Sequence, residues 1–85
     1  MAKQRHPADV EWGQALAHRE FRERLARNMK RLRAMRGYSQ VELAKRSDLS
    51  VSTINRVERA TANTLISTMK AVVTGLGCTF AELLN

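Results

Sequence analysis

Cysteine, proline and aromatic residues are all scarce in this chain of 85 residues, and their scarcity excludes several classes of protein. A single cysteine, Cys78, cannot form an internal disulfide, and no spacing of cysteine and histidine fits a zinc site. The apolar runs are short and are interrupted by charge, so the sequence predicts neither a membrane span nor a secretory signal. We therefore expect a cytoplasmic protein in which Cys78 is a small packed residue without a redox role.

Side chains suited to catalysis are also rare. The two histidines, His6 and His18, have no serine, cysteine or paired carboxylate at a useful spacing, and the chain has no glycine-rich phosphate loop. Solvation at the surface explains both histidines better than a catalytic site does. The sequence therefore predicts a protein that is not an enzyme and that holds neither a metal nor a cofactor.

Positive charge, in contrast, is abundant, with a formal net charge of +7. Ten of the fifteen basic residues but only four of the eight acidic ones lie at or before Arg36, so the amino-terminal part carries most of the excess. Such an excess favours an acidic polymer as partner, because binding releases condensed counterions and long-range attraction steers the encounter. The alternative is that these arginines only form the solvated face of a helix.

A central stretch from Gln40 to Arg59 predicts two short helices joined by a sharp turn. Ser39 and Glu42 have the spacing of a capping box, so the first helix should begin at Gln40. Ser50 is placed to cap the second helix. Ile54 and Val57 share one face of this helix, and the residues that point elsewhere are Val51, Ser52, Asn55, Arg56 and Arg59. A pair of helices of this kind, packed around a small residue, presents its second helix to the DNA major groove.

The segments that flank this stretch are helical as well. One apolar stripe predicts an amphipathic helix that ends at Gly37, and it consists of Phe21, Leu25, Met29 and Leu32. A second stripe predicts a helix that Asn63 or Thr64 caps and that Gly75 and Gly77 close. The members of this second stripe are Ile66, Met69, Val72, Val73 and Leu76.

The carboxyl-terminal residues predict one more short helix. Thr79 and Glu82 repeat the capping-box spacing, and Phe80, Leu83 and Leu84 form a last apolar turn. Because so short a helix is not stable alone, it must pack on the domain or across a dimer.

The central motif and its flanks resemble the Cro and phage-repressor type of helix-turn-helix, also called the xenobiotic-response-element family. The likeness covers the range from Leu25 to Leu84 and implies an all-α fold, a compact lambda-repressor-like bundle of about five short helices. The residues that carry it are Leu32-Arg33, Gly37-Tyr38-Ser39-Gln40, Glu42-Leu43-Ala44, Leu49-Ser50, Thr53-Ile54, Arg56 and Glu58.

Two positions depart from the pattern of that family. Asp48 and Ala60 stand where the family usually has glycine, in the turn and after the second helix. Aspartate tolerates a left-handed backbone better than most residues, so the first change should be mild. Alanine tolerates it less well, so we expect the end of the second helix to differ here.

The resemblance also implies a role for individual side chains. It implies DNA base contacts by Ser50, Val51, Ser52 and Arg56, and DNA phosphate contacts by Ser39, Gln40, Thr53 and Asn55. Arg56 carries a planar fork that matches the O6 and N7 acceptors of guanine, and the alternative is that it meets a phosphate. Arg33 and Glu58 correspond to a structural ion pair.

Residues 1–20 lie outside the family core and form either an arm or an extra helix, whereas residues 21–85 form the helix-turn-helix DNA-binding domain. Met1 to Pro7 is basic and without periodicity, so we expect a mobile terminus in preference to an arm in the minor groove. Ala8 to His18 shows a fragmentary helical pattern that Gly13 weakens. Trp12 is its one large side chain, and it should pack on the domain or on a second subunit.

The sequence therefore predicts a sequence-specific transcriptional regulator, in the first place a repressor that binds an inverted-repeat operator as a homodimer. Phe80, Leu83 and Leu84 are the exposed apolar candidates for the dimer contact, with Trp12 as an alternative. A second hypothesis is an antitoxin-type protein of the same family that also neutralises a protein partner. A membrane-surface helix is excluded, because the stripe of the first family helix is needed for the core.

Overall fold

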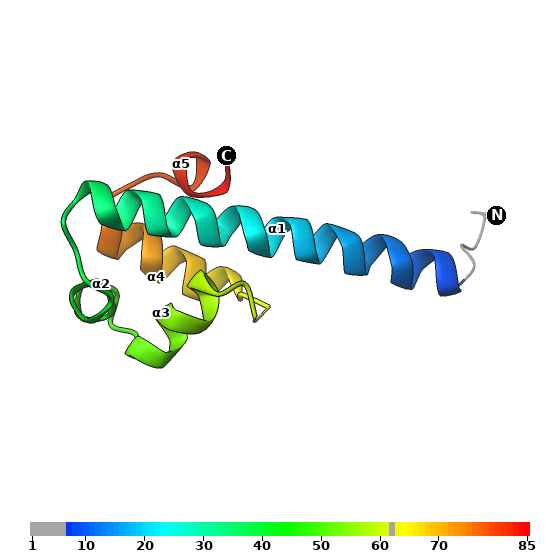
Figure 1. Ribbon diagram of the computed structural model, residues 1–85, viewed down its shortest axis with the longest axis horizontal. Coiled ribbons are helices and arrows are strands. Elements are labelled where there is room, and N and C mark those ends of the chain that lie inside the picture. Colours follow the sequence, from blue (N-terminus) through cyan, green and yellow to red (C-terminus); the bar gives the residue numbers. More distant parts are fainter. Residues whose placement is uncertain (1–6, 62) are drawn as a thin grey trace.

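The computed structural model describes residues 7–61 and 63–85, with side chains from His18 onward. Within these residues the chain forms five α-helices, and no strand is present. They are α1 (Pro7–Met35), α2 (Gln40–Ser47), α3 (Val51–Glu58), α4 (Ile66–Leu76) and α5 (Phe80–Leu84). Helix α2 packs against α3 and α4, and α1 packs against α3 and α5 (Figure 1). The predicted all-α bundle is confirmed.

Helix α1 is longer than the sequence pattern suggests. The separate helix expected over Ala8 to His18 is instead the first part of one helix of 29 residues, which extends beyond the other elements (Figure 1). A glycine inside a helix costs only about 1 kcal/mol, and Gly13 is followed by alanine, leucine, arginine and glutamate, which favour the helix. The expected terminal arm covers Met1 to Pro7. Residues 1–6 lie outside the described residues, and Pro7 is the first residue of α1.

The core is built from the apolar stripes of all five helices. Leu25, Met29 and Leu32 face inward from α1, as their spacing predicts. The other buried members are Leu43 and Ala44 of α2, Ile54 and Val57 of α3, Met69, Val72 and Leu76 of α4, and Leu83 of α5.

Four of the five helices end in the same way, with two backbone hydrogen bonds around a residue of positive φ. Gly37 follows α1 with φ 70°, Asp48 follows α2 with φ 54°, and Gly77 follows α4 with φ 65°. After α3 the residue is Ala60, with φ 58°, and its amide donates to Val57 O while that of Thr61 donates to Arg56 O. The expected difference at the end of α3 is therefore absent, because Ala60 adopts the left-handed conformation despite its Cβ.

This strained alanine gives a first prediction. A non-glycine residue in the left-handed region costs about 1–2 kcal/mol of strain. Glycine removes this strain but loses more backbone entropy on folding, which offsets part of the gain. We therefore expect Ala60→Gly to stabilise the fold by about 1 kcal/mol, seen as a rise in the thermal midpoint of several degrees. Gly77→Ala is the matched control, since Gly77 has a similar φ and no atom near the added Cβ, and its midpoint should fall. A lower midpoint for Ala60→Gly would contradict this account.

Side-chain caps start three of the helices, but not all in the predicted form. Ser39 Oγ accepts from the Glu42 amide at 3.0 Å, whereas the Glu42 carboxylate binds Arg46 Nε at 2.9 Å instead of completing the box. The box of Thr79 and Glu82 is complete, and hydrogen bonding from the Thr79 amide lowers the pKa of Glu82 below its usual range.

Helix α4 begins without the side-chain cap that the sequence predicts. Its N-cap position is Leu65, which makes no side-chain cap hydrogen bond. Asn63, an expected cap, instead accepts from Arg22 Nη1 at 2.8 Å, and Arg22 Nε also donates to Ala60 O at 3.3 Å. Asn63 therefore ties the loop after α3 to α1, which is a contact between segments distant in sequence.

Gly75 was expected to close α4 together with Gly77, but only Gly77 ends the helix, and Gly75 is its penultimate residue. The residue is buried where α4 crosses α2. A Cβ added to Gly75 would lie 3.0 Å from the Ser47 amide nitrogen and 3.1 Å from the Arg46 carbonyl carbon. Glycine at this position therefore allows the two helices to approach closely.

One expected dimer residue is instead part of the core. Leu83 is 0% exposed, and the Asn28 side-chain amide donates to its carbonyl oxygen at 2.7 Å, which fixes α5 on α1. Leu83 is thus unavailable for contact with a second copy. Phe80 is 39% exposed and Leu84 is half-buried, so both remain candidates. Cys78 packs against the core, and burial raises the pKa of its thiol.

Candidate nucleic-acid interface

Helix α3 has two chemically distinct faces. Ile54, Val57 and Glu58 are buried against the rest of the domain. The opposite face is polar and accessible, with Val51, Ser52, Arg56 and Arg59 exposed and Thr53 and Asn55 half-buried. Because none of the exposed residues is needed for the core, this face is available to a partner.

The start of α3 is held by two hydroxyl groups. Ser50 Oγ accepts from the Thr53 amide at 3.1 Å and lies 2.9 Å from Thr53 Oγ1. A hydroxyl group has one proton and two acceptor sites, so one of the two protons serves the pair and the other is left for an external acceptor. The first turn of α3 therefore offers a hydroxyl donor at the surface.

The start of α2 is a second polar feature near the surface. Ser39 caps it, and the first amides of a helix have no partner within the helix. The aligned peptide dipoles place partial positive charge at this end, which favours an anion. Ser39 is exposed and Gln40 is half-buried here, so the end of the helix is accessible.

The expected ion pair between Arg33 and Glu58 is present in the structure. Arg33 Nε donates to Glu58 Oε2 at 2.7 Å and Arg33 Nη2 donates to Oε1 at 2.9 Å, which is a bidentate contact. The hydrogen bond to Glu58 raises the pKa of Arg33, and Arg33 Nη1 also donates to Tyr38 O at 2.9 Å. The pair joins α1 to the last residue of α3.

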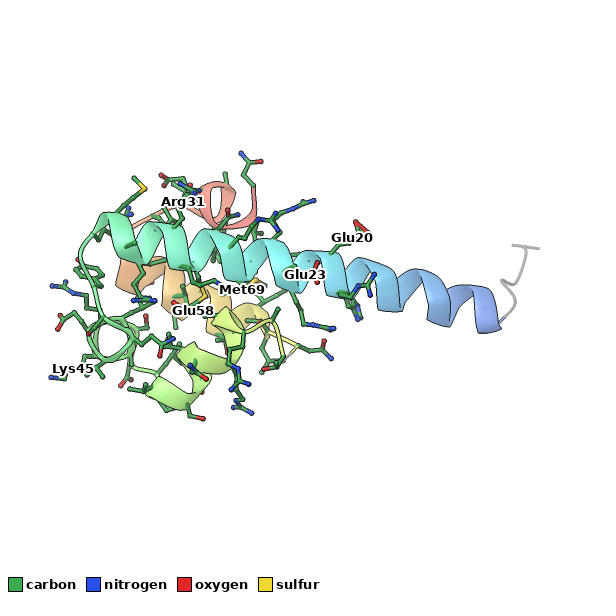
Figure 2. The ribbon with its side chains drawn as sticks, viewed as in Figure 1. Glu20, Glu23, Arg31, Lys45, Glu58 and Met69 are labelled. Carbon is green, nitrogen blue, oxygen red and sulfur yellow. The ribbon has the colours of Figure 1, made fainter. Side chains whose placement is uncertain are left out.

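Glu58 also joins α2 to this arrangement, a contact that sequence reasoning missed. Gln40 Nε2 donates to Glu58 Oε1 at 3.0 Å, and Asn55 Nδ2 donates to Gln40 Oε1 at 3.4 Å. Glu58 lies in the space between α1 and the α2–α3 pair (Figure 2). One buried carboxylate thus joins the two helices of the motif in addition to their apolar packing, and no local pattern in the sequence indicates this bond.

Metal sites and membrane spans are two further possibilities for the part of the chain that the structure describes. No group of three histidine, cysteine or acidic side chains in this part has the proximity needed to hold a metal ion. None of its helices has the length and apolar character required to cross a bilayer. The polar face of α3 and the start of α2 form the candidate site.

Known helix-turn-helix proteins match both the sequence and the fold of this chain. A family model, HTH_3, described as helix-turn-helix, matches residues 29–83. The chain is similar to the structure of a hypothetical transcription factor from Neisseria, with 32% identity and a TM-score of 0.75 over 80% of this chain and 78% of that one. It is similar to an HTH_3 family transcriptional regulator from Vibrio cholerae, with 26% identity and a TM-score of 0.75 over 78% of this chain and 37% of that one.

A more distant likeness concerns the fold alone. The restriction-modification controller protein C.Esp1396I has 24% identity and a TM-score of 0.70, over 74% of this chain and 81% of that one. A comparison with curated proteins gives no match. Because the family match covers more than half of the chain and the arrangement of α2 and α3 agrees with it, this protein belongs to the HTH_3 helix-turn-helix family of DNA-binding transcriptional regulators.

Proposed function

We propose that this protein is a repressor that binds an inverted-repeat operator as a homodimer, with α3 of each copy in the major groove. The observation that carries the proposal is the division of α3 into a buried face and an accessible polar face that also holds Arg56 and Arg59. A single domain of this size makes few base contacts, and a dimer solves this by reading two half-sites about 34 Å apart.

We also propose contacts to DNA for individual side chains. Ser50, the N-cap of α3, contacts base edges together with Val51, Ser52 and Arg56. Ser39, Gln40 and Thr53 contact phosphates, since the capped start of α2 and the hydroxyl pair of α3 present donors. The exposed Phe80 and the half-buried Leu84 form the contact between the two copies.

Replacement of Arg56 tests the reading role of α3. An arginine that binds guanine through two hydrogen bonds contributes about 1–3 kcal/mol of discrimination. We expect Arg56→Ala to relax the preference at one symmetric position in each half-site, as measured by sequencing DNA selected from a random pool. Arg24→Ala is the matched control, because it removes an equal charge from the exposed surface of α1 and should leave every preference unchanged.

The same measurement distinguishes a phosphate contact. If Arg56 meets the backbone, affinity should fall for all sequences alike, and the salt dependence of binding should flatten by about one unit of log slope. A selection profile for Arg56→Ala equal to that of the parent at every position excludes the base-reading role. Sedimentation that gives a monomer at micromolar concentration, both free and on DNA, excludes the homodimer.

A further inference from the structure

The direction of each hydrogen bond around Glu58, from donor to acceptor, is fixed by the chemistry of the carboxylate. An ionised carboxylate only accepts hydrogen bonds, and Glu58 Oε1 takes them from Arg33 Nη2 and Gln40 Nε2. The amide of Gln40 must therefore turn its nitrogen toward Glu58, because its oxygen would face the carboxylate without a proton between them. Its carbonyl oxygen, Oε1, points away from Glu58 as a result.

The orientation of the Gln40 amide in turn fixes that of the Asn55 amide. Gln40 Oε1 is an acceptor, so the neighbouring Asn55 amide must present its nitrogen, and Asn55 Nδ2 lies 3.4 Å from it. One hydrogen on Nδ2 is used in this contact. The second hydrogen and the acceptor Oδ1 make no other hydrogen bond with the described residues, so Asn55 offers one donor and one acceptor side by side.

The position of Asn55 on α3 places this pair of groups toward the proposed DNA surface. At about 100° per residue, Asn55 lies one turn after Val51 and on the arc between Val51 and Arg56, both of which are exposed. The Asn55 amide is bonded on one side only, to Gln40, which is itself held by Glu58. Its outer edge therefore lies among the residues that face the groove.

We propose that Asn55 is a specificity-determining residue that reads adenine in each half-site, with Gln40 as its positioning residue. The inference rests on the proposed function. Adenine presents an N6 donor beside an N7 acceptor in the major groove, which matches the Oδ1 acceptor and Nδ2 donor of asparagine. The family resemblance implies a phosphate contact for Asn55, but a phosphate has only acceptors, so it would use the free Nδ2 hydrogen and leave Oδ1 without a donor.

The experiment is selection of DNA from a random pool by the full chain, followed by affinity measurement on the preferred site and on single-base changes. For the parent, exchange of the preferred adenine should weaken binding about 5- to 150-fold. Asn55→Ala should abolish this discrimination at that position only. Asn55→Asp keeps the size of the side chain but offers acceptors alone, so its preference should move toward cytosine, whose N4 is a donor.

Gln40→Ala tests the positioning role separately. It leaves Asn55 in place but removes the partner that orients its amide, so the adenine preference should be reduced while that at the Arg56 position is kept. A residue that contacted only phosphate would weaken all sequences alike and would leave both preferences intact. Thermal unfolding of each variant establishes that it is folded.

The outcomes separate the inference from the function on which it rests. A parent that selects an inverted repeat, with an Asn55→Ala profile that is unchanged or uniformly weaker, overturns the role of Asn55 and leaves the proposed function standing. A parent that selects no sequence at all overturns both. Loss of preference at the adenine position alone, in both Asn55→Ala and Gln40→Ala, supports the inference.

Discussion

Glu58→Ala is expected to destabilise the fold by about 3 kcal/mol, because removal of one partner from a buried ion pair leaves the other without compensation. The Glu58 side chain is 3% exposed and accepts from both Arg33 and Gln40. The Arg33 side chain keeps 21% of its surface in water, which places the expected loss at the lower end of the range for buried pairs. Urea denaturation with linear extrapolation measures the change.

Two variants serve as controls for this result. Glu23→Ala removes an exposed carboxylate from α1 and should alter the free energy of unfolding by less than about 0.5 kcal/mol. The double variant Arg33→Ala/Glu58→Ala should lose less than the sum of the two single variants, since neither charge is then left unpaired. A loss below about 1 kcal/mol for Glu58→Ala would contradict the structural role of the pair.

Gly75→Ala should have the next largest effect and should also destabilise the fold. The added methyl group would press on Ser47 and on the backbone of α2, and such overpacking costs about 1–3 kcal/mol. The better helix propensity of alanine offsets about 1 kcal/mol of this cost. We expect a net fall in the thermal midpoint of about 4–8 °C for each kcal/mol lost.

Ser47→Ala provides the matched background. The hydroxyl of Ser47 is the nearest group to the added methyl, and it is buried without a hydrogen-bond partner in the described structure. Its removal should therefore cost little and should restore part of the stability lost in Gly75→Ala. The recovery should be incomplete, because the backbone contacts remain. A midpoint of Gly75→Ala at or above that of the parent would show that α2 and α4 do not approach so closely.

The parts of the fold that depend on local chemistry were predictable from the sequence. Ser39, Ser50 and Thr79 cap the helices that they were expected to cap, because each cap is a bond between residues three apart. Gly77 and Asp48 end their helices in the left-handed conformation. The apolar stripes also predicted most of the buried residues of α1 and α4, but Ile66 is 74% exposed and Phe21 and Val73 are half-buried.

The parts that depend on contacts between distant segments were not predictable. Leu83 is an apolar residue near the chain end, and it is buried because α5 packs on α1, where Asn28 donates to its carbonyl oxygen. Asn63 has the chemistry of a cap, but Arg22 occupies its oxygen. The role of Gln40 between Glu58 and Asn55 likewise depends on three helices that meet in space. The sequence pattern also did not predict that α1 is continuous, because the apolar periodicity near Gly13 is weak even though the residues around it favour a helix.

The two faces of α3 make the proposed recognition surface exchangeable. Residues 51, 52 and 56 take no part in the core, so a library that varies them while it keeps Ile54, Val57 and Glu58 should yield folded proteins with new target sequences. Position 55 is the exception. Its side chain is bonded to Gln40, which in turn is bonded to Glu58, so a change there should be selected together with a change at Gln40. On the proposed function, redesign for another operator therefore involves three independent positions and one coupled pair.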